Sequence, residues 1–127
     1  SQEKTFATAI NCMDGRVQIP VIQYIKSKYS VDYVDVITLP GPNKVLAEGK
    51  DVSVLETVKK CVEISVTRHH SNLIAVCGHH DCAGNPSPRE TQIQHIKEAI
   101  SQIQSWRPQV QVIGLWVNQN WEVEEVG

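Results

Sequence analysis

The sequence predicts an α/β fold, with a doubly wound, mostly parallel sheet and a C-terminal hairpin strand. Two observations support this prediction. Strand-like and helix-like periods alternate along the chain in the order β-α-β-α-β-α-β-β. The stretch NLIAVC, residues 72–77, is continuously apolar, as expected of a central parallel strand covered on both faces. No repeat or linker divides the chain, so we expect residues 1–127 to form one domain.

The first half of the chain supplies two strands and one helix. TFATAIN, residues 5–11, is a short β-prone run that leads into the turn CMDGR. The helix that follows is indicated by apolar residues at helical spacing, with Pro20 tolerable in its first turn: Val21, Ile22, Ile25 and Tyr29. YVDVITL, residues 33–39, alternates and is β-branched, which predicts a second strand. The prolines of PGPNK, residues 40–44, indicate a turn.

A second helix is expected after Gly49. Either Asp51 or Ser53 can cap it, and Ser53-x-x-Glu56 fits a capping box. One face of this helix carries apolar residues: Leu55, Val58, Val62 and Val66.

The clearest helix start is SPRE, with Ser87 as the cap, Pro88 at the first helical position and Glu90 completing a capping box. An isoleucine stripe is expected to be its buried face: Ile93, Ile96, Ile100 and Ile103. VQVIGLWV, residues 110–117, predicts the fourth strand, and NQN is a tight turn into the hairpin strand WEVEEV.

Composition excludes several function classes. Twelve basic and fourteen acidic side chains leave no basic stripe, so we expect no nucleic-acid partner. No apolar run approaches the length of a membrane span, and the N-terminus lacks the pattern of a signal peptide, so a cytoplasmic protein is expected. In that reducing setting the four cysteines serve ligation, catalysis or burial; Cys61 and Cys77 are expected in the core.

Two polar clusters follow predicted strands. In doubly wound sheets, ligands bind beyond the carboxyl ends of the strands, where the strand order reverses. With the order 2-1-3-4, that point lies between the first strand, which ends at CMDGR, and the third, which ends at GHHDC. Cys12, Cys82 and one histidine would form a Cys₂His zinc site with an open position. The spacing alone leaves both His79 and His80 possible.

CMDGR and GHHDC together resemble the C-x-D-x-R and H-x-x-C signatures of β-class carbonic anhydrases, and the similarity covers nearly the whole chain. The resemblance implies one Zn²⁺ per chain, bound by Cys12, His79 and Cys82, with Asp14 and Arg16 as a dyad beside the metal. It also implies reversible hydration of CO₂ to bicarbonate by a zinc-bound hydroxide, and a homodimer or higher homo-oligomer.

The dyad has a physical role in this interpretation. Zn²⁺ lowers the pKa of its bound water, and the Asp14 carboxylate accepts a hydrogen bond from the resulting hydroxide and orients it. Arg16 holds Asp14 ionised through a bidentate pair. In the family, the equivalent aspartate can instead become the fourth zinc ligand and switch the site off; both states stay open for Asp14.

Three features depart from the family pattern. LPGPN, residues 39–43, stands where the family has an Arg-Asn-Ala-Gly-like turn, so substrate access or the dimer contact is expected to differ. Ala83 replaces a glycine after the last ligand, and its methyl group is expected to narrow the pocket. The sequence begins almost at the first strand, so we expect a short member without the N-terminal helical arm.

Other functions compete with this one. The same scaffold could hydrolyse carbonyl sulfide or carbon disulfide, or hold zinc as a binding or regulatory module without catalysis. A redox function of Cys12 and Cys82 lacks a C-x-x-C pair, and a flavodoxin-like nucleotide site lacks a glycine-rich loop after the first strand. His80 is expected to have no role and that of Asp81 is left open, while His69 and His70 are placed at a helix C-terminus.

Overall fold

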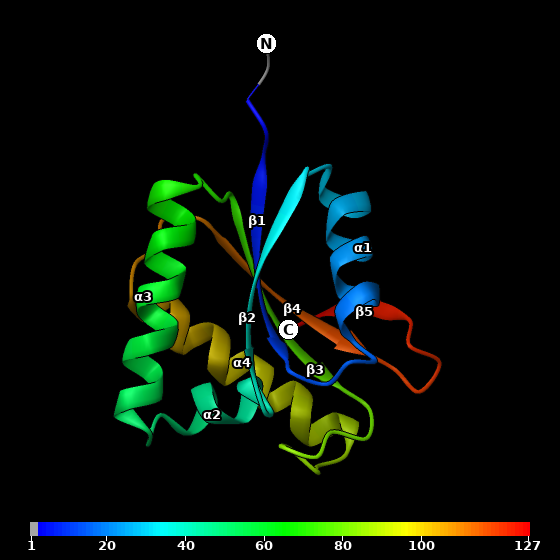
Figure 1. Cartoon of the computed structure of the whole chain (residues 1–127). Helices are drawn as coiled ribbons and strands as arrows, with labels where there is room; N and C mark the ends of the chain where they lie inside the picture. The colour runs from blue at the N-terminus through cyan, green and yellow to red at the C-terminus, as the bar shows by residue number, and fades with distance from the viewer. Residues whose placement is uncertain (1–2) are drawn as a thin grey trace.

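The computed structural model describes residues 3–127, so residues 1 and 2 of the predicted domain lie outside the described part. The elements follow one another as β1 (Phe6–Cys12), α1 (Gln18–Tyr29), β2 (Tyr33–Leu39), α2 (Pro42–Glu48), α3 (Val52–Arg68), β3 (Leu73–His79), α4 (Arg89–Ser105), β4 (Gln111–Val117) and β5 (Val123–Val126). They form one sheet in the order β2-β1-β3-β4-β5 (Figure 1). The predicted fold class, strand order and C-terminal hairpin are confirmed.

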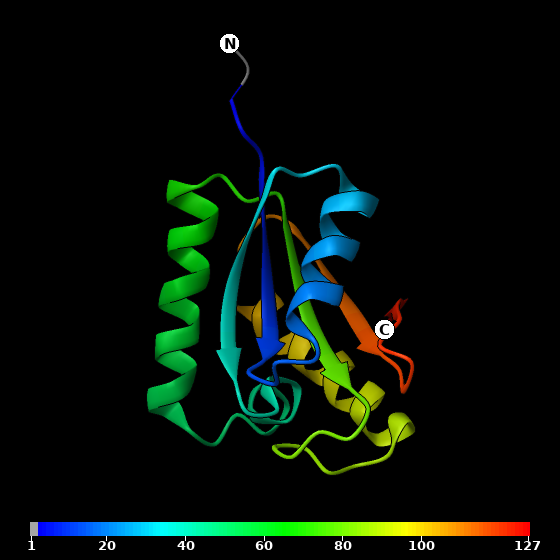
Figure 2. The same cartoon turned by 45° about the vertical axis from the view of Figure 1, so that its right-hand side comes forward.

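Within residues 3–127, four strands are parallel, and only β5 pairs antiparallel, with β4. Figure 2 shows the arrowheads of the four parallel strands at the same edge of the sheet. β1 pairs with β2 over its full length, whereas its pairing with β3 covers only residues 8–10 of β1 and 74–76 of β3. The two central strands therefore separate before they end, at the switch point predicted from the sequence.

The sheet lies between two helical layers. Helix α1 covers one face, and α2, α3 and α4 lie on the other (Figure 1). Each face has its own buried apolar cluster, one built around Val21, Ile25 and Leu115 and the other around Ile74, Ile96 and Ile103. Strand β3 is buried along its whole length, as its continuous apolar run predicted. Within residues 3–127, no helix is both long and apolar enough to cross a membrane.

The prediction of a simple turn at PGPNK was wrong, because α2 begins there. Gly41 caps the helix with a positive φ of 54°, and Pro42 occupies its first position. A proline at this position loses no hydrogen bond, since the first N–H groups of a helix have no partner within it. Gly49, with φ 63°, ends the helix after two turns. The prolines thus mark a helix start in addition to a turn.

Both predicted capping boxes were wrong, although Asp51, one of the two caps predicted for α3, is confirmed. Asp51 is the cap of α3, with its Oδ1 accepting a hydrogen bond from the Val54 N–H at 3.2 Å, and Ser53 lies inside the helix. The cap of α4 is Pro88 and makes no side-chain cap hydrogen bond, so Ser87 lies outside the helix. The carbonyl of Pro88 still accepts from the Gln92 N–H at 3.0 Å, which closes the first turn.

The buried face of α4 is rotated from the predicted stripe. It consists of Gln92, Ile96, Ala99 and Ile103, whereas Ile93 and Ile100 are only half-buried. Cys77 is buried as predicted, but Cys61 on α3 is half-buried rather than a core residue. The surprising member of the buried face is Gln92, a polar residue aligned with apolar ones.

Candidate metal centre

The fold brings Cys12, His79 and Cys82 together at the carboxyl end of the sheet. Cys12 is the last residue of β1, His79 is the last of β3, and Cys82 lies in the loop that follows. Their potential ligand atoms all lie within 4.8 Å of one another, and the two sulfur atoms are 3.8 Å apart. All three residues are at least 96% buried. Two cysteines 70 residues apart thus meet because parallel strands end at the same edge.

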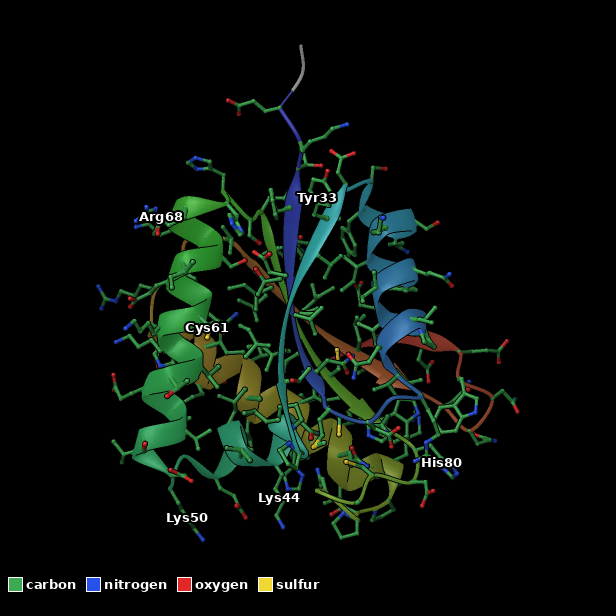
Figure 3. All side chains as sticks on the ribbon, viewed as in Figure 1. Tyr33, Lys44, Lys50, Cys61, Arg68 and His80 are labelled. Atoms are coloured by element: carbon green, nitrogen blue, oxygen red, sulfur yellow. The ribbon has the colours of Figure 1, made fainter. Side chains whose placement is uncertain are left out.

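The geometry distinguishes His79 from His80. His79 Nδ1 lies 2.7 Å from the His80 carbonyl oxygen, which can only accept, so Nδ1 carries the hydrogen and Nε2 has a free lone pair. Nε2 is buried and has no hydrogen-bond partner among the described residues. The side chain of His80, labelled in Figure 3, is exposed. The backbone N–H of His80 donates to the Val117 carbonyl in β4 at 2.9 Å. Only His79 belongs to the cluster.

The two thiols are electrostatically unequal. A hydrogen bond from the Cys82 thiol stabilises the Cys12 thiolate and lowers the pKa of Cys12, and the same bond raises the pKa of Cys82. Burial disfavours the charged ring of His79, yet the neighbouring Cys12 side chain and the hydrogen bond to the His80 carbonyl together raise its pKa. The cluster thus favours one thiolate, and a bound cation would stabilise the second.

These three residues fit zinc. Two sulfurs each about 2.3 Å from a tetrahedral zinc would lie about 3.8 Å apart, and the observed separation of Cys12 Sγ and Cys82 Sγ is 3.8 Å. The unpartnered Nε2 of His79 supplies the lone pair that a metal requires. Two thiolates and one imidazole form a donor set typical of zinc sites with an open position.

Asp14 and Arg16 form a bidentate pair next to the cluster. Arg16 Nη2 donates to Asp14 Oδ2 at 2.7 Å and Arg16 Nε to Asp14 Oδ1 at 3.0 Å, while the Arg16 backbone N–H donates to Oδ1 at 2.9 Å. These contacts lower the pKa of Asp14 to about 2. Asp14 Oδ2 lies 4.0 Å from His79 Nε2. An ionised carboxylate therefore lies directly beside the potential ligand atoms.

The guanidinium of Arg16 has two further contacts that the sequence analysis did not assign. Asp81 accepts from it twice, through Oδ2 at 3.3 Å and through its carbonyl at 3.1 Å. The ring of Trp121, in the turn between β4 and β5, lies 4.6 Å from the guanidinium carbon, a cation–π contact. Arg16 is thus held on three sides, by the loop after β3, by the hairpin and by Asp14.

A hollow of about 220 Å³ adjoins the cluster, and the surface that lines it is almost entirely apolar. Its lining residues are Cys12, Met13, Asp14, Pro40, Ala83 and Gly84.

The expectation that Ala83 occupies a close backbone approach was wrong. Its side chain is exposed, and the close approach is made by Gly84. A Cβ atom on Gly84 would lie 2.6 Å from the Gly41 nitrogen and 2.6 Å from the Pro40 carbonyl carbon. The loop after β3 and the start of α2 therefore touch backbone to backbone at this point.

Three buried amide side chains behind the cluster were missed in the sequence analysis: Asn43, Asn85 and Gln92. Gln92 forms hydrogen bonds with both the backbone N–H and the carbonyl of His79. A signal for it was available, because the buried positions 96, 99 and 103 of α4 lead back to position 92 at helical spacing. A polar residue on an apolar helix face calls for a buried partner.

Comparisons with known proteins agree with the fold. The family model described as "Putative carbonic anhydrase" matches residues 2–127. The β-carbonic anhydrase isoform I of Trichomonas vaginalis is similar in structure, with a TM-score of 0.62, 14% identity and coverage of 98% of this chain and 85% of that one. No curated protein matches the sequence.

Two other solved structures share the fold. One is a tetrameric β-carbonic anhydrase of Sordaria macrospora, with a TM-score of 0.55, 13% identity and coverage of 100% of this chain and 82% of that one. The other is the apo form of a carbon disulfide hydrolase, with a TM-score of 0.55, 11% identity and coverage of 95% and 78%.

Proposed function

Because the chain belongs to the family described as "Putative carbonic anhydrase", we propose that it catalyses the reversible hydration of CO₂ to bicarbonate with one zinc ion held by Cys12, His79 and Cys82. The observation that carries this proposal is the buried Cys₂His cluster where β1 and β3 end, with its sulfurs 3.8 Å apart and a free imidazole nitrogen. Zinc, when bound, lowers the pKa of coordinated water toward neutrality and thereby supplies the nucleophile.

Asp14 orients that nucleophile in this proposal. With its pKa lowered to about 2, the carboxylate is ionised at neutral pH and can only accept hydrogen bonds. Its Oδ2 lies beside His79 Nε2, so a hydrogen bond accepted there fixes the direction of the attacking lone pair. Arg16 keeps Asp14 ionised and prevents its rotation through the bidentate pair.

The apolar hollow suits CO₂. The substrate is small, uncharged and without a dipole, so carbon-rich walls such as those of Pro40 and Ala83 accept it without unpaired polar groups. Bicarbonate carries a charge that these walls do not stabilise, which favours its release.

The test is stopped-flow CO₂ hydration by zinc-loaded protein, compared with Asp14→Ala at matched zinc content. We expect hydration faster than in buffer, and a loss of about 100-fold in Asp14→Ala, the scale of a misoriented reacting group. Asp32→Ala is the matched control, because this exposed carboxylate bonds Thr5 far from the cluster and should leave the rate unchanged.

A zinc-replete protein no faster than buffer would contradict the proposal. Turnover of carbon disulfide or carbonyl sulfide by that same protein would assign the site to sulfur analogues on this scaffold. Tight zinc binding without turnover of any of these substrates would indicate a binding or regulatory module.

We also propose a homo-oligomer. One structural neighbour is described as tetrameric, and the side chains of Met13, at the hollow, and Ile19, on α1, are 62% and 65% exposed, which offers apolar surface for a second subunit. Light scattering coupled to size-exclusion chromatography should give at least twice the mass of 14.2 kDa; a monomer at micromolar concentration would contradict it.

A further inference from the structure

The backbone of His79 lies where one side of β3 has lost its partner strand. Pairing of β1 with β3 ends at residue 76, whereas pairing of β3 with β4 continues to residue 79. The N–H of His80 points to β4, where it bonds Val117. Since successive residues of a strand direct their N–H and C=O groups to opposite sides, those of His79 point to the side that β1 has left.

Gln92 supplies the missing partner. Its Oε1 accepts a hydrogen bond from the His79 N–H at 3.2 Å, and its Nε2 donates to the His79 carbonyl at 2.8 Å. A side-chain amide has the same donor and acceptor groups as a peptide unit, so Gln92 takes the place of a neighbouring strand for this one residue. The Gln92 side chain is 99% buried, which shields these bonds from water.

The same amide also holds the loop that carries Cys82. Gln92 Nε2 lies 3.2 Å from the carbonyl oxygens of both Asn85 and Ser87. These residues belong to the segment between β3 and α4, which starts at His80 and contains Cys82. The Gln92 side chain therefore holds this segment at both ends, at His79 immediately before it and at Asn85 and Ser87 near its end.

Two other residues make this contact possible. Asn43 Nδ2, from α2, donates to Gln92 Oε1 at 3.2 Å and to the Gln92 carbonyl at 3.3 Å, which keeps the amide from turning over. Gly78 leaves room for it, because a Cβ atom there would lie 2.7 Å from Asn43 Nδ2 and 2.9 Å from Gln92 Oε1. The glycine that opens GHHDC is thus explained by close packing.

We propose that Gln92 is a positioning residue of the metal centre, which holds His79 and the Cys82 loop so that their ligand atoms stay together in the metal-free protein. This inference rests on the proposed function. Gln92 touches no ligand atom, so its effect passes through the backbone of His79 and the loop. Pre-formed ligands bind a metal more tightly, and loss of a supporting hydrogen bond around a metal site typically weakens affinity about 10- to 100-fold.

The test uses Gln92→Met, which keeps an unbranched side chain of similar length and removes both hydrogen-bonding groups. Co²⁺ is the probe, because thiolate-to-metal absorption reports its binding to Cys12 and Cys82. We expect Co²⁺ affinity to fall about 10- to 100-fold. Asn43→Ala is a second and milder variant, which removes the brace on Gln92 and the hydrogen bond that Asn43 Oδ1 accepts from Asn85 Nδ2 at 3.3 Å but keeps the bonds of Gln92 to His79. Its Co²⁺ affinity should fall between those of wild type and Gln92→Met.

Ile103→Val is the matched control, since Ile103 is fully buried on the same face of α4 but contacts none of these groups. We expect Gln92→Met and Ile103→Val both to lower the melting temperature, and only Gln92→Met to lower the Co²⁺ affinity. A purely structural role of Gln92 would leave the Co²⁺ affinity unchanged in both variants. Amide hydrogen exchange in the metal-free protein gives a second readout: the His79 amide should exchange at least about 10-fold faster in Gln92→Met, while the His80 amide, bonded to β4, keeps its rate.

The outcomes separate the two proposals. If the wild type shows no thiolate absorption with Co²⁺, the metal centre itself is wrong, and the role of Gln92 at it falls as well. If the wild type binds Co²⁺ and Gln92→Met binds it equally well with unchanged exchange at His79, the proposed function stands and the positioning role is overturned.

Discussion

Both ends of the sheet hold a cluster of buried polar side chains. Within residues 3–127, every buried side-chain nitrogen and oxygen of the cluster at the amino end has a hydrogen-bond partner, which is not so at the carboxyl end. At the amino end, the hydroxyl of Thr8 lies 2.5 Å from that of Ser65 and 2.7 Å from that of Ser71. Ser65 donates to Asp35 at 2.7 Å, and Asp35 also contacts His69 Nδ1. Figure 3 places Tyr33 and Arg68 at this end and His80 at the other.

At the carboxyl end, two buried side-chain atoms stay without a partner within residues 3–127. They are His79 Nε2 and Asn85 Oδ1, and His79 Nε2 faces two thiols and a carboxylate. A buried polar cluster in which every group is bonded stabilises the fold, whereas one that leaves a lone pair free beside two thiols is prepared for a ligand. The difference predicts distinct consequences for substitutions at the two ends.

The largest effect is expected from Cys82→Ala. Loss of one of three ligands should weaken zinc binding by more than about 100-fold, the upper end for loss of a supporting contact. Competition with a chromophoric chelator measures this affinity. Cys61→Ala, a half-buried thiol on α3, should leave it unchanged. Equal affinities of Cys82→Ala and wild type would remove Cys82 from the metal site.

Gly84→Ala should destabilise the protein by about 1–3 kcal/mol, because the new methyl group meets the backbone of Gly41 and Pro40, which cannot move aside as a flexible side chain would. It should also slow CO₂ hydration, since Gly84 lines the hollow. Ala83→Gly is the control, with a cost of at most about 1 kcal/mol. Urea unfolding that gives Gly84→Ala the stability of wild type would contradict the close approach.

Thr8→Val tests the amino end. The change keeps the shape of the side chain but leaves Ser65 and Ser71 each without one partner, so we expect a loss of about 1–3 kcal/mol in the free energy of unfolding. Zinc affinity should not change, because the hydroxyl groups of Thr8, Ser65 and Ser71 bond one another and lie at the opposite end of the sheet from the metal ligands. A weakened zinc affinity in this variant would mean that the two ends are coupled.

The smallest effect is expected from Trp121→Ala. An exposed cation–π contact contributes about 0.5–1 kcal/mol, so a looser Arg16 should reduce kcat/KM for CO₂ about two- to fivefold. Trp106→Ala, on a Trp outside the site, is the matched control. A loss in Trp121→Ala as large as that in Asp14→Ala would give the hairpin a direct role.

The sequence predicted the parts of the molecule that depend on periodicity and motif. The apolar run of β3 and the alternation of β2 fixed the sheet, and the order of its strands brought CMDGR and GHHDC together. Helix α2 was missed because prolines and a glycine are equally typical of turns and of helix starts. Local pattern does not separate the two.

Other misses depended on three-dimensional contacts. The close backbone contact is made by Gly84 and not by Ala83. It depends on how the loop after β3 packs against the start of α2, at Pro40 and Gly41. Gln92 was missed because its partners, the backbone of His79 and the loop beyond it, come from other elements. The choice of His79 over His80 likewise needed the carbonyl contact that fixes the tautomer.

The most direct test of the metal centre is X-ray absorption at the zinc edge of the zinc-loaded protein. The account predicts two sulfur atoms at about 2.3 Å and two nitrogen or oxygen atoms at about 2.0–2.1 Å, with one sulfur lost in Cys82→Ala. A spectrum without sulfur in the first shell would contradict the assignment of Cys12 and Cys82 as ligands, and with it the central claim.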